Sequence, residues 1–388
     1  MPTPPEPAAP AAWIVTPAGT PTFEVWGLRP VERLQRSLER AGCIAARVLG
    51  DADAPQTPAT GSVVVARSDW IYDERLVEAL VGAEDDVLLV APEDRVPVAA
   101  RVSAERAAST LAALRTGRGD LDLPTRVPVE LAPSYTAKLR KTEPPYLVAA
   151  RPETLHEIEA LTFAASYKGA TDLVTKWVLP RPARAVTRRL AASHVHPNTV
   201  TLASWVLAIA AFALFWSGSF GPGLIAAWGM TFLDTVDGKL ARVTLTSSRL
   251  GDFLDHGLDL VHPPFWWWAW GAGIGWAWHP ETLVVVAGYF VGRLIEGVFL
   301  ATFGFETHSW RPIDTLFRTI TARRNPNLIL FSVGTAAGRP DLGMTLVALW
   351  TAASLAFHTL RLLQAFAARL RGENVTPWNR DLAGKAAG

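Results

Sequence analysis

The chain has 388 residues, with 37 Lys and Arg, 36 Asp and Glu, and a formal net charge of +1. This balance argues against nucleic acid as a partner, because nucleic-acid-binding proteins carry a basic excess. The single cysteine, Cys43, excludes an internal disulfide and fits a reducing compartment. No basic segment followed by an apolar core opens the chain, so we expect no secretory signal.

The first part of the chain is charged and predicts a soluble domain. Residues 1–12 are rich in Pro and Ala and are expected to form a disordered tail. Strand and helix patterns then alternate over residues 13–150, with β-branched runs at 62–66 and 87–91. This order predicts an α/β layer with a mainly parallel sheet, long enough to bury its own core. Residues 120–150 within it are expected to be an irregular connector.

Residues 151–195 are expected to connect this domain to a membrane. A helix is predicted from Glu153 to Ser166, and residues 168–192 then interleave basic with large apolar side chains. That mixture is typical of a helix lying on an anionic membrane surface, and a solvated basic face is the alternative.

Six apolar segments follow, and each is a candidate membrane span. They cover residues 200–217, 222–243, 254–278, 282–303, 327–338 and 342–367. Apart from Arg339, Lys and Arg gather in the loops on one side, which by the positive-inside rule is cytoplasmic and includes both termini. The fold class we expect is an α-helical membrane protein with six transmembrane helices at 196–370, an N-terminal soluble α/β domain, and a tail at 371–388. The expected location is the cytoplasmic (inner) membrane.

The third apolar segment carries two further features. Its tryptophans are typical of an aromatic belt at the membrane interface and lie at positions 266, 267, 268, 270, 276 and 278. His262 has the helical spacing that puts it on the face of Asp255 and Asp259. We interpret it as an interior histidine, with a contact to an acceptor as the alternative.

Four aspartates form two pairs with helical spacing, Asp234 with Asp237 and Asp255 with Asp259. Residues three or four apart share one face of a helix, so two helices joined by the polar turn at 244–248 would point all four carboxylates into one space. An ionised aspartate in a membrane span costs about 2.5–3.5 kcal/mol, so several together require cations. Hard oxygen ligands in this number favour Mg²⁺ or Mn²⁺ over zinc. Scattered surface acids on a helical hairpin are the alternative.

This stretch resembles the CDP-alcohol phosphotransferase family, whose pattern is D-x2-D-G-x2-A-R-x8-G-x3-D-x3-D. Every spacing is met here, by Asp234, Asp237, Gly238, Ala241, Arg242, Gly251, Asp255 and Asp259. Members of this family have a membrane domain of six helices. They transfer the phospho-alcohol part of a CDP-alcohol to a second hydroxyl and release CMP. The resemblance implies such a transferase here, acting in phospholipid or phosphodiester biosynthesis.

The resemblance also implies a metal site. Asp234, Asp237 and Asp255 would hold two Mg²⁺ or Mn²⁺ ions. Asp259 would be the general base that accepts the proton of the acceptor hydroxyl, while also touching the second metal.

Substrate-binding roles follow from the same pattern. Gly238 and Ala241 would let the nucleotide approach the helix, Arg242 would pair with phosphate, and Gly251 would allow close helix packing. The run Pro197-Asn198-Thr199-Val200-Thr201 is similar to a P-N-x-x-T run that lies near the nucleotide in this family. It adds Asn198 and Thr201 to the substrate-binding set, and Asn198 also fits a helix N-cap.

The N-terminal domain resembles, more weakly, the nucleotidyltransferase domain that some family members carry. Asp69 follows a strand where such domains place a metal-binding acid, although a turn residue is the better interpretation. The glycine-rich phosphate loop is replaced by Pro17-Ala18-Gly19-Thr20-Pro21, and prolines offer no amide donors. We therefore interpret the domain as degenerate and expect it not to make CDP-alcohol.

The donor and the acceptor stay open at this stage. One version uses CDP-diacylglycerol and a polar alcohol, and the other, slightly favoured by the N-terminal domain, uses a soluble CDP-alcohol and a lipid or polyol. Arg293 and Glu296 within the fourth span, and Arg323 and Arg324 before the fifth, could hold a phosphorylated acceptor or an anionic lipid. For Arg323 and Arg324 the alternative is that they only mark the cytoplasmic side of the membrane. Expected partners are thus a CDP-alcohol donor, an alcohol or lipid acceptor and membrane lipids, with a homodimer left open. A non-catalytic membrane scaffold is the alternative from another class.

Overall fold

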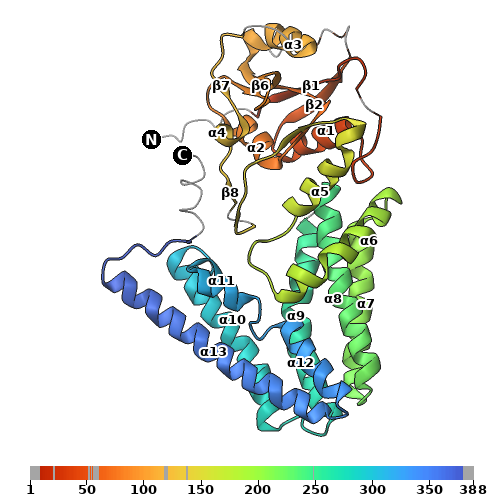
Figure 1. Ribbon diagram of the computed structural model, residues 1–388, viewed down its shortest axis with the longest axis vertical. Helices are drawn as coiled ribbons and strands as arrows, with labels where there is room; N and C mark the ends of the chain where they lie inside the picture. The colour runs from red at the N-terminus through yellow and green to blue at the C-terminus, as the bar shows by residue number, and fades with distance from the viewer. Residues whose placement is uncertain are drawn as a thin grey trace.

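The computed structural model describes residues 9–378 except 21, 51–52, 54, 56–60, 118–120, 137–138 and 248; the side chains of 45, 249–256, 258 and 259 are also outside the description. Figure 1 shows an α/β region at one end of the molecule and long helices at the other. Residues 1–8 of the expected tail lie outside the described residues. The first strand already begins at Ala11, so the α/β region starts before residue 13.

The α/β region contains one six-stranded sheet. Its strand order is β2 (Ile44–Leu49), β1 (Ala11–Val15), β3 (Ser62–Arg67), β6 (Pro97–Ser103), β5 (Val87–Val90) and β7 (Thr125–Arg126). β1 runs parallel to β2 and β3, and β5 to β7, but β6 runs antiparallel to both of its neighbours. The expectation of a mainly parallel sheet was therefore wrong in its centre. Only a short loop joins β5 to β6, and antiparallel pairing is what so short a connection allows.

Helices cover both faces of this sheet, because side chains alternate along each strand. On β1, Ala12 and Ile14 pack in one cluster with α1 (Pro30–Arg40) and α2 (Glu74–Gly82). Trp13 and Val15 pack in the opposite cluster with α3 (Ala107–Thr116). The predicted layered architecture is thus present (Figure 1).

Residues 120–150 are more ordered than the connector that we expected. They contain α4 (Pro128–Leu131), the hairpin of β8 (Tyr135–Thr136) and β9 (Lys141–Thr142), and β10 (Leu147–Ala149). β10 pairs antiparallel with β4 (Trp70–Tyr72). Strands of two or three residues carry too little periodicity to be seen in a sequence.

Two helices lead from the sheet to the long helices. They are α5 (Leu155–Ala165) and α6 (Pro180–Ala192), separated by the π-helical turn η3 (Val174–Val178). The surface helix predicted over 168–192 is thus confined to its second half. Trp177 and Val178 at the turn are exposed, as the membrane-surface interpretation requires.

Helices lie at the positions of all six predicted spans: α7 (Pro197–Trp216), α8 (Phe220–Val243), α9 (Arg249–Gly273), α10 (Pro280–Phe303), α12 (Arg324–Ala336) and α13 (Pro340–Leu370). Between α10 and α12 lie the short η4 (Thr307–Ser309) and α11 (Pro312–Arg318). Within the described residues, α7, α10 and α13 are long and apolar enough to cross a membrane. α8 carries the charges of the motif, and α12 has 13 residues. Three candidate spans are therefore found, and six stay a prediction.

The tryptophans of α9 correct another expectation. Trp266, Trp267 and Trp270 are at most 1% exposed and pack with Phe215 and Phe331 in the core between the helices. The indole nitrogens of Trp266 and Trp270 donate to backbone carbonyls of neighbouring helices. An interfacial belt was the wrong interpretation for these three, because composition cannot tell which face of a helix meets a neighbour.

The α/β region is fastened to the end of α8. Arg33 on α1 donates to the carbonyl of Val243 at 2.6 Å, and Arg36 donates to the carbonyl of Thr244 at 3.0 Å. These carbonyls end α8 and have no partner within the helix. Cations at a helix C-terminus are also favoured by its dipole. The α/β region therefore fixes the helix that carries the first two motif aspartates.

Candidate active site

The first pair of motif aspartates lies one turn apart on α8. Asp237 is 3% exposed, and its Oδ2 accepts a hydrogen bond of 2.7 Å from the Thr201 hydroxyl on α7. Thr201 was predicted to bind substrate. Its hydroxyl orients a carboxylate, as outer-shell groups do around metal ligands, and its role at the substrate stays a prediction.

Asp234 forms an ion pair with an arginine of the same chain. Its Oδ2 accepts a hydrogen bond of 2.6 Å from Arg324 at the start of α12. Arg324 was interpreted as lining an acceptor pocket or marking topology, and its contact with the motif was not foreseen. The pair ties α12 to α8 beside the site.

The second pair belongs to α9, which the structure places after a short turn that follows α8. The side chains of Asp255 and Asp259 lie outside the described residues, as does Gly251. The convergence of all four carboxylates therefore stays a prediction.

A cavity of about 570 Å³ opens beside the motif, within the size range of small-molecule sites. Asp234, Gly238 and Arg242 line it, whereas Asn198 and Ala241 do not. Asn198 is also not the N-cap of α7: His196 takes that place and its Nδ1 accepts from the Asn198 amide at 3.1 Å. An imidazole nitrogen is an acceptor too, which the usual N-cap preferences do not include.

Gly238 provides open space on the cavity wall. A Cβ built on it would find Arg242 Nη1 as its nearest neighbour, 3.8 Å away. The fold therefore does not require glycine here, and a mid-helix glycine costs about 1 kcal/mol relative to alanine. The missing side chain instead leaves room for a ligand to approach α8.

We expect Gly238→Ala to separate stability from function. The substitution should raise or maintain the melting temperature, because alanine is the better helix former. CDP-alcohol binding should weaken, because the methyl group occupies the approach to the helix. Thermal unfolding and nucleotide binding are measured on the same preparation, with Gly257→Ala on α9 as the matched control. A variant that binds as tightly as wild type would contradict the assignment.

Two basic side chains of α8 contact the segment that follows α5. Lys239 Nζ and Arg242 Nη1 both donate to the carbonyl of Ser166, at 2.9 and 3.1 Å. Lys239 is 6% exposed and lies 3.4 Å from the centre of the Tyr167 ring. Lys239 was interpreted only as a topology marker, because a single lysine after the motif carries no positional signal of its own.

The cavity is basic. Its described lining has four acidic side chains and eight basic ones, the latter being Arg140, Lys168, Lys239, Arg242, Arg293, Arg318, Arg323 and Arg324. The excess is large for a chain whose net charge is +1. Such a surface attracts anionic ligands such as phosphates.

The clearest indication that the cavity binds an anion comes from Arg318. Its Nε and Nη1 are buried and have no hydrogen-bond partner in the described part of the chain. Burial, with the neighbouring Arg323, lowers the pKa of Arg318 to about 9. A buried donor without an acceptor is costly, and a bound anion would satisfy it.

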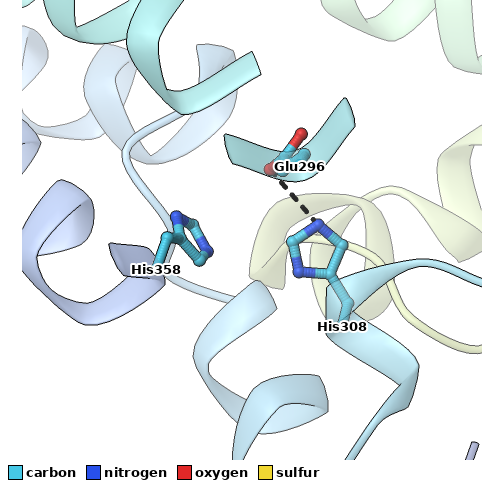
Figure 2. Close-up of side chains that lie close together, drawn as sticks. All are labelled: Glu296, His308 and His358. Carbon is cyan, nitrogen blue, oxygen red and sulfur yellow. Dashed lines mark ion pairs between the residues drawn. The ribbon is translucent and has the colours of Figure 1, made fainter. Parts of the chain in front are cut away.

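A cluster of Glu296, His308 and His358 lies beside Arg323 (Figure 2). One ligand atom from each lies within 4.8 Å of the others, a geometry that a metal could use. However, Arg323 donates to Glu296, and Arg293 lies 3.5 Å from the same carboxylate. A metal here would face two guanidiniums, which repel it. Burial lowers the pKa of His308 to about 3, so it is neutral and can accept. The cluster is therefore better suited to orienting the Arg323 guanidinium than to binding a metal.

Two parts of the α/β region were compared with nucleotidyltransferases, Asp69 and the loop at 17–21. Both form contacts within the region itself. Asp69 forms an ion pair of 2.7 Å with Arg67. In the loop after β1, the Thr20 amide and hydroxyl both bond to the carbonyl of Pro17; Pro21 lies outside the described residues. That the domain does not make CDP-alcohol stays a prediction.

The chain is similar to known lipid synthases in its helical part. Residues 194–323 match the family model of CDP-alcohol phosphatidyltransferase. Archaetidylinositol phosphate synthase of Pyrococcus horikoshii is 32% identical over 80 residues, which are 20% of this chain and 42% of that protein. Phosphatidylinositol phosphate synthase of Streptomyces avermitilis is 36% identical over 107 residues, 25% of this chain and 44% of that protein. The chain thus spans less than half the length of these curated relatives.

A crystal structure of phosphatidylinositol phosphate synthase from Mycobacterium tuberculosis, with CDP-DAG bound, is 21% identical with a TM-score of 0.36. It covers 47% of this chain and 94% of that one. All eight fixed positions of the aspartate motif fall inside the matched range of the family model. Residues 194–323 therefore match the CDP-alcohol phosphatidyltransferase family model over the whole of the aspartate motif, in agreement with the resemblance that its spacing indicates.

Proposed function

We propose that this protein is a membrane transferase that moves the phospho-alcohol part of a CDP-alcohol to an acceptor hydroxyl. The proposal rests on one observation: the motif residues Asp234, Gly238 and Arg242 line the same cavity as a group of basic side chains. One end of the cavity suits the nucleotide diphosphate, and the other suits a second anionic substrate.

The reaction balances without a further co-reactant. The acceptor oxygen attacks the phosphorus that bears the donor's alcohol, and a new phosphodiester forms. The bond between that phosphorus and the bridging oxygen breaks, and CMP leaves. Asp259 takes the proton of the acceptor hydroxyl.

We propose a divalent metal site at the motif, with Mg²⁺ or Mn²⁺ as the ions. The donor set fits hard cations, since Asp234 and Asp237 offer carboxylate oxygens one turn apart, and Asp255 and Asp259 would add the other two. When bound, such ions neutralise the diphosphate and the leaving CMP. Thr201 fixes the Asp237 carboxylate for this purpose.

We expect Thr201→Val to reduce metal affinity by about 10–100-fold, as loss of an outer-shell partner does. Valine keeps the shape and removes the donor to Asp237. The measurement is the Mg²⁺ concentration that gives half-maximal turnover. Ser204→Ala is the matched control, because the Ser204 hydroxyl lies one turn further on α7 and donates to the carbonyl of Val200. Equal shifts in both variants would argue against a specific role for Thr201.

For the substrates, we propose a CDP-activated lipid as donor and a phosphorylated alcohol as acceptor. Two features support this version: the basic cavity wall, and the archaetidylinositol phosphate synthase and phosphatidylinositol phosphate synthase among the relatives. The test incubates purified protein with Mg²⁺ and labelled CDP-diacylglycerol or CDP-inositol. Inositol phosphate, glycerol phosphate or a lipid extract is the acceptor, and the product is identified by mass. A product from CDP-inositol and lipid alone would establish the other version.

We propose six membrane spans with the aspartate site and both termini on the cytoplasmic side. Outward-facing apolar side chains on α7 and α10, among them Leu202, Val206 and Phe290, support contact with lipid. The basic residues that flank the turn between α8 and α9, Lys239 and Arg242 near the end of α8 and Arg249 at the start of α9, support the orientation.

The orientation predicts which cysteines react from outside intact cells. In a Cys43→Ser background, Ser247→Cys should resist an impermeant thiol reagent until lysis, whereas Ser217→Cys at the opposite end should react at once. Both serines are exposed. The reverse labelling pattern would overturn the topology.

A further inference from the structure

The hairpin of β8 and β9 extends from the α/β region to the cavity of the phosphatidyltransferase domain. Leu139 in its turn accepts a hydrogen bond of 2.7 Å from the amide of Gly169. Arg140, the next residue, lines the cavity and pairs with Glu306 from the loop after α10. A residue from outside the family match at 194–323 thus reaches the candidate active site.

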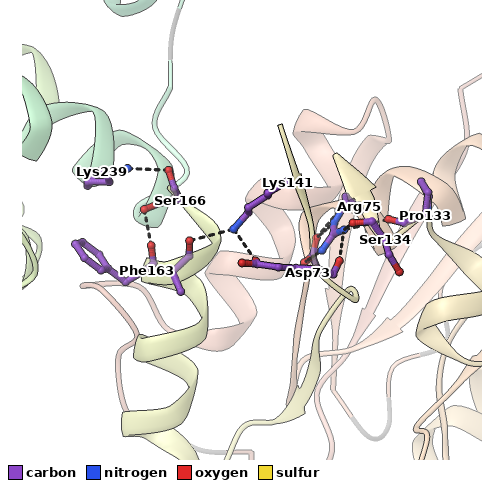
Figure 3. A network of polar contacts seen from close by, with 10 residues as sticks. Asp73, Arg75, Pro133, Ser134, Lys141, Phe163, Ser166 and Lys239 are labelled. Atoms are coloured by element: carbon purple, nitrogen blue, oxygen red, sulfur yellow. Dashed lines mark hydrogen bonds and ion pairs between the residues drawn. The ribbon is translucent and has the colours of Figure 1, made fainter. Parts of the chain in front are cut away.

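The hairpin is held at its base by a network of polar contacts (Figure 3). Arg75 pairs with Asp73 at 2.7 Å and donates to the carbonyls of Pro133, Ser134 and Glu143. Lys141 on β9 donates to the carbonyl of Ala164 at 3.1 Å. This is the end of α5 to which Lys239 of α8 also bonds through Ser166. The hairpin and the motif helix therefore share one anchor.

Gly169 sets the position of the hairpin turn. A Cβ at this glycine would lie 2.3 Å from the Arg140 carbonyl oxygen, closer than atoms can approach. Arg140 itself has a φ of 53°, which is costly for a residue with a side chain. Glycine would relieve this strain, so the turn holds the Arg140 side chain beside the cavity at a conformational cost.

Arg140 adds a positive charge to the part of the cavity that contains Arg318 and Arg323. Its side chain is 18% exposed. Burial lowers its pKa, Glu306 opposes this, and the nearby Arg323 lowers the pKa further. Arg140 likewise contributes to the lowered pKa of Arg318. Three guanidiniums thus share one region, and a bound anion would relieve their repulsion.

We propose that Arg140, Arg318 and Arg323 form an anion subsite that takes a phosphate-type group, so that the α/β region completes the active site. In this subsite Arg140 determines specificity for a phosphorylated acceptor, which rests on the function proposed above. The role of the α/β region is then to supply a substrate contact, in place of the nucleotidyl transfer for which it lacks the residues.

The first experiment measures binding of inorganic phosphate to the full-length protein in detergent, by equilibrium dialysis with labelled orthophosphate. Arg140→Ala should weaken binding by at least about 10-fold, as expected for a lost hydrogen bond to a charged group, and Arg140→Lys should weaken it less. Gly169→Ala should weaken it as well, although every arginine is present, because the turn must move. The matched controls are Arg47→Ala, an exposed arginine of β2, and Gly82→Ala, whose Cβ would meet nothing within 4 Å. Thermal unfolding confirms that each variant is folded.

Phosphate affinity within two-fold of wild type in both Arg140→Ala and Gly169→Ala would overturn the inference. Turnover gives a separate test: Arg140→Ala should raise KM for the phosphorylated acceptor and leave KM for the donor within two-fold. Equal rises in both KM values would also overturn the specificity role. If wild type binds phosphate through Arg140 but transfers nothing, the proposed function fails and the subsite stands.

Discussion

Asp237→Asn is expected to lower turnover by roughly 10³-fold or more, because several kcal/mol of charge stabilisation by the metal is lost. The asparagine oxygen can still accept the hydrogen bond that Thr201 now gives to the carboxylate. The fold should therefore persist, and the effect should appear in catalysis. The variant is compared with wild type by rate of CMP release and by thermal unfolding. Asp85→Asn, an exposed aspartate of the α/β region, is the control for loss of a negative charge.

Removing the metal should reproduce this loss in the wild-type protein. Excess EDTA is expected to stop turnover, and Mg²⁺ or Mn²⁺ to restore it, because the proposed ligands are the hard carboxylate oxygens of the motif aspartates. Asp237→Asn should recover little at any Mg²⁺ concentration. Full turnover in EDTA, or near-normal rates in the variant, would contradict the metal assignment.

Asp259→Asn is expected to reduce turnover by about 10²–10⁴-fold, the usual contribution of a general base, while CDP-alcohol still binds. The base acts on the acceptor hydroxyl and not on the nucleotide, so donor affinity should change little. Asp252→Asn is the matched control, since Asp252 belongs to the same helix and lies outside the motif.

Nucleotide binding and turnover of Asp259→Asn are measured side by side. A collapse of binding together with the rate would make Asp259 mainly a metal ligand. Unchanged turnover would remove it from the mechanism altogether.

The parts of the site that could be predicted are those fixed by local helix geometry. Asp234 and Asp237 follow helical spacing, whereas Gly238 and Arg242 were implied by the resemblance to the family pattern. The structure places Asp234, Gly238 and Arg242 on the wall of one cavity. No knowledge of the rest of the fold was needed for this. The six helices were likewise predictable from their apolar segments, although apolar length alone marks only three as spans.

The contacts between distant segments could not be predicted. The hydrogen bond from Thr201 to Asp237 was not foreseen, because sequence separation says nothing about which side chain faces which. The hairpin that carries Arg140 has strands of two residues, too short for a periodic pattern. The mixed sheet depends on β6, whose antiparallel pairing follows from a loop length and not from strand composition.

The central claim is tested most directly by whether CMP release depends on an acceptor. Purified full-length protein in detergent is given Mg²⁺ and CDP-diacylglycerol or CDP-inositol, with and without inositol phosphate, glycerol phosphate or a lipid extract, and CMP and product are quantified together. We predict CMP and a phosphodiester product in equal amounts, only when both a matching acceptor and the metal are present, and almost none from Asp237→Asn. No CMP from any combination, or the same CMP release without an acceptor, would contradict the account.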